Sequence, residues 1–457
     1  MTLRNRILKA HPAILVLASF LLAIAVGTVL LMLPISTRNE TIPFVDALFT
    51  ATSAVCVTGL IVVDTGTFFT RFGQCVILSL IQIGGLGVMT ISVALFRWIG
   101  KSISFRQRMV MQDLFAPAPR ADILSLVKRT LLFTLGAEAL GAALLSIHWS
   151  REFPFFTAVY TAVFHSISAF CNAGFSLFSD SMMQYRDNLP LNVTLCSLIV
   201  VGGIGFPALY DLQSWFQGRL KRQHLRLSVQ TRTVLLTTLF LIAGGAMIFA
   251  FLEHRVMTAA PSFKTTLLTS IFQSITCRTA GFNTVDIASL GEATLALMIF
   301  LMFFGASPGS CGGGVKTTTL ALIGAFTLSR VRRTRRVNMF KKSIPGDAVN
   351  RSISLILVSI GLISLVLFML LVGQPSGGYG LLGHQGSFLA YLFETVSAFG
   401  TVGLSMGATP ELGTWSKVWI IFMMIVGRVG VLTFSYIIVS APAGNGIEYS
   451  EESIMVG

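Results

Sequence analysis

The chain has 457 residues, of which 54% are hydrophobic and only 11% are charged, and its formal net charge is +14. A soluble domain carries about 25% charged residues, so a chain this apolar could not cover its own surface in water. Composition therefore excludes an ordinary soluble domain and indicates a protein of the lipid membrane.

Eight apolar segments follow one another along the chain, and each has about the 20 residues that are needed to cross a bilayer. Two of them carry a single charge: Glu138 lies in Thr130–Ile147, and Arg428 lies in Val418–Val439. The six others contain no Asp, Glu, Lys or Arg: Pro12–Pro34, Gly73–Phe96, Leu191–Tyr210, Thr233–Leu252, Ala293–Val315 and Ser352–Gly373. The sequence thus predicts eight membrane helices.

The positive charge is concentrated in alternate connections. Most of the 33 lysine and arginine residues fall in the N-terminus and in the segments Arg97–Arg129, Arg219–Arg232 and Arg330–Arg351. Under the positive-inside rule these loops and both termini face the cytoplasm. The distribution argues against a nucleic-acid partner. The basic run Arg330–Arg336 is typical of contact with anionic lipid, with docking of a cytoplasmic partner as the alternative.

Each outward connection contains a short segment that begins with phenylalanine and ends with glycine, and the third is one residue shorter than the others. In chain order the segments are Phe49–Gly59, Phe164–Gly174, Phe272–Gly281 and Phe393–Gly403. A second glycine-rich element follows within the next helix of each unit: Gly84–Gly87, Gly202–Gly205, Gly305–Gly309 and Gly427–Gly430. The chain is therefore a fourfold internal repeat.

The predicted fold class is an all-α membrane protein with four parallel helix–pore-loop–helix repeats, comprising eight membrane helices and four re-entrant pore helices around a central pore. Each repeat begins and ends inside, so all four have one orientation and can close around one axis. We expect the repeats at residues 1–99, 100–218, 219–329 (with a broken second helix) and 330–457, the last including a cytoplasmic tail. The pore helices are predicted at Phe49–Val55, Phe164–Phe170, Phe272–Cys277 and Phe393–Phe399.

The tripeptide after each pore helix is expected to be extended and to direct its carbonyl groups at the axis, where they replace the hydration shell of a cation. Helix C-termini that point at the same place favour positive charge. Glycine suits the last position because it adopts positive φ without a Cβ penalty. The predicted potassium-binding residues, here called the filter segments, are Val57, Thr58, Gly59, Asn172, Ala173, Gly174, Thr279, Ala280, Gly281, Thr401, Val402 and Gly403. We expect no other metal site.

The sixth span is interrupted by glycines and one proline, between Gly305 and Lys316. A continuous helix is costly there, because each glycine costs about 1 kcal/mol and proline about 3 kcal/mol. The sequence predicts an intramembrane loop below the filter segments that obstructs the pore, with a kinked helix as the alternative. The predicted gate residues are Gly305, Gly309, Ser310, Gly312, Gly313, Gly314, Lys316 and Arg428.

Arg428 and Lys316 supply the charge of this predicted gate. An arginine within the membrane costs at least about 2.5 kcal/mol and marks a functional site by default. We expect Arg428 to repel cations or to bind loop carbonyls, with a structural pairing away from the axis as the alternative. Lys316 acts similarly or extends to the cytoplasmic side. Arg278 is expected to point behind the third filter segment.

Other chemistry is not supported by the sequence. Gly309–Thr317 is similar to a phosphate-binding loop, but it has one residue too many before Lys316 and no soluble βα context. The six histidines form no HExxH motif and there are no paired aspartates, so we expect no enzyme activity. We expect no cofactor in this chain. The six cysteines lie in apolar or re-entrant segments and are expected to be buried without disulfides.

The filter motifs resemble those of the Trk/Ktr/HKT superfamily of cation transporters, and most closely those of its bacterial KtrB-type potassium uptake subunits. The resemblance covers nearly the entire chain, and all four loops match in order. It rests on TSAVCVTGL (Thr52–Leu60), SISAFCNAGF (Ser166–Phe175), SITCRTAGFN (Ser274–Asn283), VSAFGTVGLS (Val396–Ser405), IQIGGLG (Ile81–Gly87) and MIVGRVG (Met424–Gly430).

The resemblance implies a subunit for potassium uptake in the bacterial inner membrane that forms a homodimer and is controlled by a cytoplasmic ring of nucleotide-binding RCK-type subunits. Glycine at all four filter positions goes with potassium selection in that family. Sodium is left open as a modulator. The alternative function is a sodium-coupled secondary carrier, although such folds usually have inverted repeats and carboxylates at the membrane midplane.

Overall fold

The structure is a computed structural model that describes residues 12–38, 41–98, 123–223, 225–253, 263–334, 336–373 and 387–431. These residues are helical apart from loops and one antiparallel hairpin, in which β1 (Asn338–Met339) pairs with β2 (Lys342–Ser343). The hairpin lies in the basic connection between the third and fourth repeats, for which the sequence predicted no strand.

The helices form four units of the predicted kind, each with a first helix, a pore helix and a second helix. The first unit contains α2 (Pro12–Leu31), α3 (Phe44–Val55), the short α4 (Thr65–Phe68) and α5 (Arg71–Trp98). The second contains α7 (Ile123–Trp149), α8 (Phe155–Phe170), α9 (Leu189–Ile204) and α10 (Phe206–Leu220). The third contains α11 (Val229–Leu252), α13 (Phe263–Thr276), α14 (Glu292–Phe303) and α15 (Thr317–Val331). The fourth contains α16 (Gly346–Val372), α17 (Ser387–Gly400) and α18 (Thr414–Val429). Single 3-10 turns occupy Pro34–Ser36, Met183–Tyr185, Ile287–Ser289 and Thr409–Glu411.

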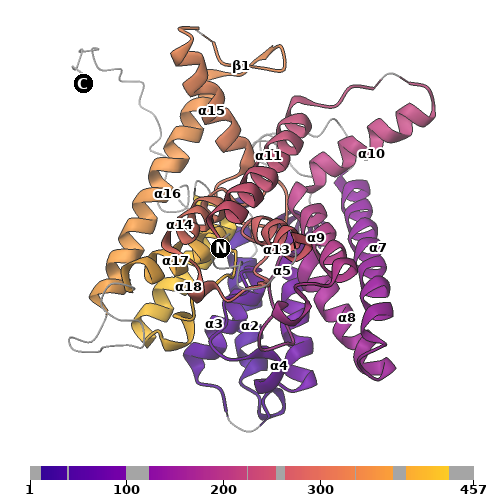
Figure 1. The fold of residues 1–457 in the computed structure, drawn as a ribbon, viewed down its shortest axis with the longest axis vertical. Helices are drawn as coiled ribbons and strands as arrows, with labels where there is room; N and C mark the ends of the chain where they lie inside the picture. Colours follow the sequence, from indigo (N-terminus) through magenta and orange to yellow (C-terminus); the bar gives the residue numbers. More distant parts are fainter. Residues whose placement is uncertain are drawn as a thin grey trace, which may run out of the picture.

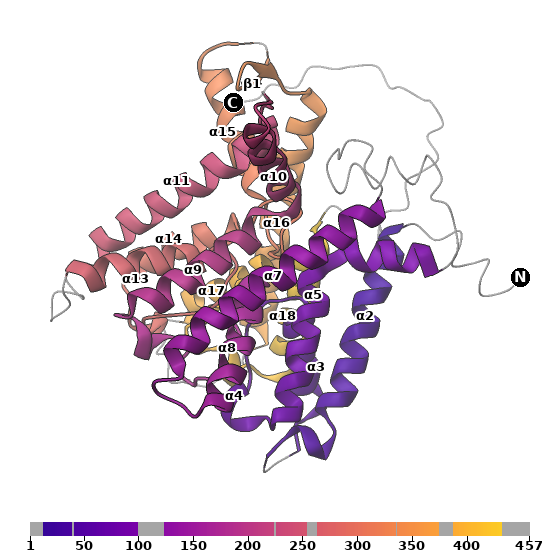
Figure 2. The same cartoon turned by 90° about the vertical axis from the view of Figure 1, so that its right-hand side faces the viewer.

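The four units close into a ring through one repeated contact. The second helix of each unit packs against the pore helix of the next, so that α5 contacts α8, α9 contacts α13, α14 contacts α17 and α18 contacts α3. The chain therefore returns to its first unit from its last. Figures 1 and 2 show the four pore helices α3, α8, α13 and α17 inside the frame that the long helices form.

The pore helices are longer than the sequence predicted. Each begins several residues before the phenylalanine that opens its predicted segment; for example, α3 begins at Phe44 and α8 at Phe155. Both of these helices follow a proline, Pro43 and Pro154, whose fixed φ suits the position before a first helical turn. The prediction had counted only the core of each segment, and it had placed Glu394 at the start of the fourth pore helix. Glu394 instead lies in the middle of α17.

The membrane helices also depart from straight spans at glycine. Among the described helices, α7 (from Lys128), α11 and α16 are long and apolar enough to cross a bilayer alone, and α9 with α10 forms a bent pair. The predicted span Leu191–Tyr210 is therefore not one helix, because the chain turns by 99° at Gly205. Gly205 has φ 93°, and Gly430 at the matching position of the fourth unit has the same φ. The part of Val418–Val439 beyond residue 431, the first predicted repeat boundary and both termini lie outside the described residues.

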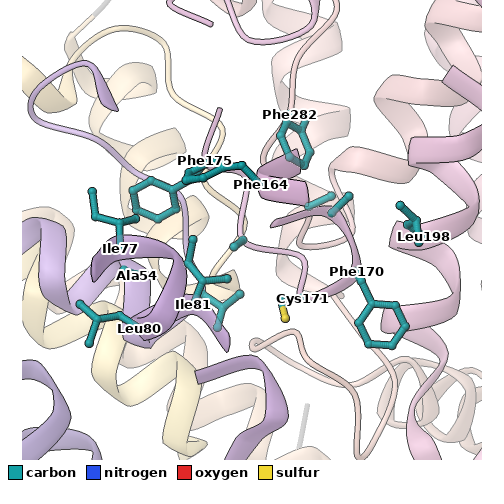
Figure 3. Close-up of a cluster of buried hydrophobic side chains, with 14 of the residues drawn as sticks. Ala54, Ile77, Leu80, Ile81, Phe164, Phe170, Cys171, Phe175, Leu198 and Phe282 are labelled. Carbon is teal, nitrogen blue, oxygen red and sulfur yellow. The ribbon is translucent and has the colours of Figure 1, made fainter. Parts of the chain in front are cut away.

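Buried apolar side chains fill the space between the pore helices and the second helices. Figure 3 shows this for the second unit, where Phe175 of the loop after α8 lies near Ile77 of α5, and Phe170 of α8 lies on the side of Leu198 of α9. These side chains are buried. Close packing of this kind fixes backbone position to a fraction of an ångström.

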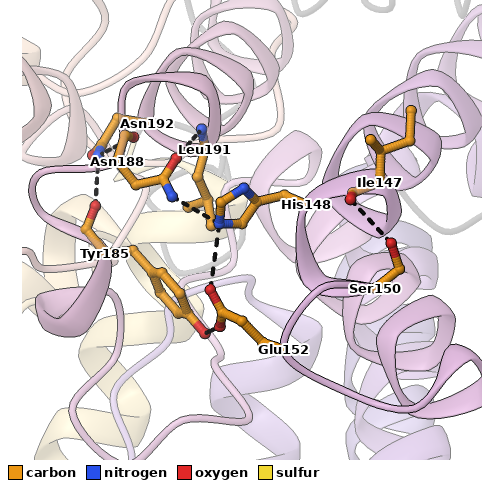
Figure 4. Close-up of polar contacts among 8 residues, drawn as sticks. All are labelled: Ile147, His148, Ser150, Glu152, Tyr185, Asn188, Leu191 and Asn192. Carbon is orange, nitrogen blue, oxygen red and sulfur yellow. Dashed lines mark hydrogen bonds and ion pairs between the residues drawn. The ribbon is translucent and has the colours of Figure 1, made fainter.

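The outward loop of the second unit is held by polar contacts (Figure 4). The Tyr185 hydroxyl donates to Glu152 Oε2 at 2.7 Å, and the Asn188 amide donates to His148 Nε2 at 2.7 Å. Asn192 donates to the Tyr185 carbonyl at 2.8 Å. These bonds tie the end of α7 to the start of α9, so the loop that follows the second filter segment is anchored on both sides.

Candidate functional site

The four filter glycines meet in a ring. A Cβ added to Gly59 would lie 2.3 Å from the Ala173 carbonyl oxygen, and one on Gly403 would lie 2.1 Å from the Thr58 carbonyl oxygen. On the opposite half of the ring, Gly281 approaches both the Gly174 Cα and the Val402 carbonyl oxygen. All four glycines have positive φ, between 70° and 91°. The structure thus brings together four tripeptides that lie far apart in the sequence, in the order of the repeats.

The first residue of each filter segment also has positive φ. The values are 56° for Val57, 58° for Asn172, 76° for Thr279 and 49° for Thr401. This conformation is unfavourable for β-branched residues, so it persists only where surrounding contacts impose it. The same deviation at four matching positions is a built feature of the repeat.

The ends of the pore helices provide those contacts. The amide of the middle residue donates to a helix carbonyl in every segment: Thr58 to Ser53, Ala173 to Ser168, Ala280 to Thr276 and Val402 to Ser397, at 2.7 to 2.9 Å. Among the residues that the structure describes, none of the twelve backbone carbonyls of the filter segments accepts a hydrogen bond. Nine of the twelve filter amides donate to groups within the protein, whereas the carbonyl oxygens remain available to a ligand.

A hydroxyl residue four positions after each phenylalanine completes the attachment, and the sequence analysis missed it. Ser53 and Ser397 accept from the amides of Gly59 and Gly403 at 3.1 Å. The equivalent hydroxyls in the other two units donate to the carbonyl oxygens one residue past the glycine: Ser168 to Phe175 at 2.8 Å and Thr276 to Phe282 at 2.5 Å. The signal was available, because these four positions align when residues are counted from the phenylalanine.

The intramembrane loop lies between α14 and α15, as the sequence predicted, and it touches the other three units at their glycine-rich elements. Ser307 N donates to the Gly203 carbonyl at 3.1 Å, and Gly314 N donates to the Gly427 carbonyl at 3.3 Å. The Cys311 thiol lies 3.3 Å from the Gly85 carbonyl oxygen. A Cβ on Gly205 would lie 2.4 Å from the Pro308 carbonyl oxygen, so glycine at that position admits the loop backbone. Glycine at 84, 202 and 427 instead admits the carbonyl ends of the pore helices.

The same loop also contacts the inner ends of two filter segments. Gly313 N donates to Thr401 Oγ1 at 2.8 Å, and an added Cβ on Gly312 would lie 2.2 Å from Thr279 Oγ1. Gly305 also approaches the Thr279 side chain. Next along the ring, the Asn172 side-chain amide lies 3.3 Å from the Thr279 hydroxyl. The loop therefore lies directly below the filter segments.

The remaining predicted gate residues shape or charge this loop. Gly309 and Gly314 have φ of 72° and 68°, and Ser310 Oγ donates to the Ser307 carbonyl at 2.7 Å. The Lys316 ammonium turns back onto the loop and donates to the Gly312 carbonyl at 2.7 Å, so it does not extend to the cytoplasmic side.

Arg428 crosses from the fourth unit to two others. One guanidinium nitrogen donates to the Cys311 carbonyl oxygen of the loop, and another donates to the Gly84 carbonyl oxygen of α5. This is the loop-carbonyl contact that the sequence analysis expected, in place of an ion pair with a carboxylate. A single side chain thus joins the loop, α5 and α18.

Two other charged residues within the membrane support the site from behind. Arg278 is 5% exposed and donates to Thr238 Oγ1 of α11 at 3.2 Å, pointing away from the filter segment that it precedes, as predicted. Glu138 of α7, whose partner the sequence left open, accepts from Gln82 Nε2 of α5 at 3.2 Å. The Cys171 thiol lies 3.8 Å from the same carboxylate.

Four like-oriented re-entrant loops around one axis define a membrane transporter of the pore-loop type. The family described as "Cation transport protein" (TrkH) matches residues 6–448. The chain belongs to this family of cation transport proteins, which is not a family of enzymes.

Similarity to individual relatives extends over nearly the entire chain. This chain is 38% identical over 456 residues to the Ktr system potassium uptake protein B of Vibrio alginolyticus, and the match covers 99% of this chain and 96% of the relative. It is 38% identical over 440 residues to the protein of that name from Bacillus subtilis, covering 96% and 95%. It is 36% identical over 454 residues to the Potassium/sodium uptake protein NtpJ of Enterococcus hirae, covering 98% of both chains.

The fold is similar to that in the crystal structure of the potassium transporter TrkH from Vibrio parahaemolyticus. The TM-score is 0.73, and the match covers 94% of this chain and 86% of that one at 17% sequence identity. This similarity confirms the predicted fold class of four parallel pore-loop repeats.

Proposed function

We propose that this chain takes potassium into the cell through a selectivity filter formed by the filter segments, with the intramembrane loop as its gate. The names of three relatives over 30% identical support potassium as the cargo. The inside-negative potential supplies about 2.3 kcal/mol per charge for each 100 mV, so inward flux of a cation needs no other energy source in this chain.

The observation that carries the proposal is the set of filter carbonyls that accept no hydrogen bond from the part of the chain that the structure describes. Carbonyl oxygens around an axis replace the hydration shell of an entering ion, and a dehydrated potassium ion needs several such oxygens at once. The ring of Gly59, Gly174, Gly281 and Gly403 lets the four backbones approach closely enough to supply them. The twelve filter residues are the potassium-binding residues of this proposal.

The gate assignment rests on the position and contacts of the intramembrane loop. The loop bonds to Thr401 and approaches Thr279 at the inner ends of the filter segments. Arg428 and Lys316 donate to its carbonyl oxygens, which places two positive charges beside the path of a cation. Conduction then requires the loop to move, and these bonds oppose that movement.

The proposed function of potassium uptake also implies partners and a cellular location. We infer a homodimer in the bacterial inner membrane, with both termini cytoplasmic, controlled by an RCK-type nucleotide-binding ring. The basic residues Arg219, Lys221 and Arg330 at the ends of α10 and α15 support a cytoplasmic position for that side. The division into four repeats with boundaries near residues 99, 218 and 329 belongs to this proposal.

Ion flux into vesicles tests the function. The purified chain in liposomes should take up potassium in response to an inside-negative potential and in the absence of sodium, and expression should restore growth of cells that lack potassium uptake. Uptake that requires sodium in fixed stoichiometry would instead favour a sodium-coupled carrier. The name of one relative, a potassium/sodium uptake protein, is consistent with that alternative function. Flux of neither ion would overturn the proposal.

A further inference from the structure

A polar, buried residue directly follows the phenylalanine of every pore-helix segment. The four residues are Thr50, His165, Gln273 and Glu394, and their exposed fractions are between 0 and 2%. Glu394 lies in the middle of α17, away from the helix start. A buried polar side chain needs a partner, so the question is what each one contacts.

The Glu394 carboxylate accepts hydrogen bonds from the segment that follows the fourth filter glycine. Its Oε1 accepts from Ser405 Oγ at 2.5 Å and from Met406 N at 3.1 Å, and its Oε2 accepts from Thr409 Oγ1 at 2.7 Å. All three partners are donors, so the carboxylate acts purely as an acceptor. One side chain thereby fixes the chain from two to six residues beyond Gly403.

His165 makes the equivalent contact in the second unit. Its Nε2 lies 3.1 Å from Ser176 Oγ and accepts from Leu177 N at 3.3 Å, and its Nδ1 lies 2.8 Å from the Thr161 carbonyl oxygen. The backbone contact assigns the ring proton to Nδ1, which leaves Nε2 as the acceptor. The ring is also stacked on Phe178 at 5.0 Å.

The match between these units is close. In both, the residue after the phenylalanine accepts from the amide three positions past the filter glycine and contacts the serine two positions past it. The third unit has a weaker version, in which Gln273 donates to Thr284 Oγ1 at 3.3 Å. In the first unit the Thr50 hydroxyl donates to the Asp46 carbonyl of its own helix at 2.8 Å, and the described residues offer it no contact with the loop. Units two and four are opposite one another in the ring.

We propose that His165 and Glu394 are positioning residues that set the outer ends of two opposing filter segments and thereby determine the preference for potassium over sodium. The inference rests on the proposed filter. The hydroxyl near the pore-helix end holds each segment at its glycine or at the next residue, and His165 and Glu394 hold the chain from two residues beyond the glycine. A carbonyl ring discriminates between ions only while its oxygens keep their spacing.

Paired substitutions separate positioning from packing. Glu394→Leu removes all acceptors, whereas Glu394→Gln retains one oxygen for Ser405 and Met406. His165→Asn reaches the Thr161 carbonyl but not the loop, whereas His165→Gln reaches the loop. We expect the Glu394→Leu and His165→Asn variants to lower the potassium-to-sodium uptake ratio in liposomes by about three- to tenfold, because in each a buried donor loses its partner. Glu394→Gln and His165→Gln should lower this ratio less, because each retains an acceptor for the loop.

Two variants on the loop side of these contacts distinguish a loss of selectivity from misfolding. Ser176→Ala and Ser405→Ala alter half-exposed residues, and we expect a lower uptake ratio with an unchanged melting temperature. Thr50→Val is the matched control from the first unit and should leave the ratio unchanged. Gly281→Ser tests the filter itself in the same assay.

The outcomes are distinct. Equal losses in the Gln variants and in their Leu or Asn counterparts would assign the effect to packing or charge and overturn the positioning role. If Gly281→Ser lowers the ratio while every His165, Glu394 and serine variant leaves it unchanged, the inference fails and the filter stands. If Gly281→Ser also has no effect, the proposed filter fails.

Discussion

Lys417 of α18 and Asp46 of α3 form an ion pair with a nitrogen–oxygen distance of 2.6 Å, although 371 positions separate them in the chain. The pair lies where the fourth unit meets the first, and its side chains are 13% and 18% exposed. It therefore fastens the one junction of the ring that no short connection in the chain spans.

Replacing this lysine should weaken the ring at that junction. We expect Lys417→Met to lower the free energy of unfolding by about 1–3 kcal/mol, because the Asp46 carboxylate loses its partner in a partly buried site. Thermal unfolding of the detergent-solubilised protein measures the change. Combining it with Asp46→Asn should cost less than the sum of the single changes, since the two residues interact directly. Additive losses would show that the pair contributes nothing.

Selectivity should depend on the filter glycines. A Cβ on Gly281 would lie 2.5 Å from the Val402 carbonyl oxygen, and the residue has φ 82°. We therefore expect Gly281→Ser to weaken the preference for potassium in competition flux assays by about tenfold, the equivalent of about 1.4 kcal/mol. Gly361→Ser on α16, where an added Cβ meets nothing within 4 Å, is the control. Unchanged selectivity would count against the filter assignment.

Shortening the intramembrane loop should open the pore. Deletion within Gly309–Gly314 removes the backbone that lies below Thr279 and Thr401, so we expect basal potassium flux to rise in liposomes without any regulatory partner. A deletion variant that folds normally and conducts no more than the parent chain would contradict the gate. Size-exclusion profiles in detergent distinguish this result from misfolding.

Arg428 should stabilise the closed arrangement of that loop. Arg428→Met removes the donors to Cys311 and Gly84, and each lost charged hydrogen bond contributes about 1.5–3 kcal/mol. We expect a higher basal flux together with a lower melting temperature. Arg186→Gln alters an exposed outward-loop arginine that pairs with Asp187, and it should leave both quantities unchanged. Loss of stability without any change in flux would make Arg428 purely structural.

The hydroxyls at the pore-helix ends should support the filter segments. Ser397→Ala leaves the Gly403 amide without its acceptor inside the protein, at a cost of about 1–3 kcal/mol. We expect reduced potassium selectivity, measured as competition by sodium. Ser79→Ala on α5 removes a hydroxyl that bonds only to the Cys75 carbonyl of its own helix, so it should have no effect. Equal behaviour of the two variants would refute the role.

Several features of the site were predictable because they repeat at fixed intervals. The filter segments, the broken sixth span and the contact of Arg428 with loop carbonyls all follow from glycine positions and from the cost of charge in a bilayer. The bend at Gly205 was not predicted, since hydropathy runs smoothly across Leu191–Tyr210 and does not register backbone direction. The lengths of the pore helices were underestimated because the prediction counted each helix only from its phenylalanine.

The sequence by itself determined the membrane class, the four parallel units and the positions of the four tripeptides that meet in a ring, because apolar length, loop charge and internal repetition are local properties of the chain. Only the tertiary structure decided what lies beside what. That Glu394 holds the loop beyond Gly403, that Lys316 turns back on its own loop and that Lys417 reaches Asp46 depend on how the helices pack. Packing sets the direction in which a side chain points and joins residues as far apart in the chain as Lys417 and Asp46, and no local pattern encodes either.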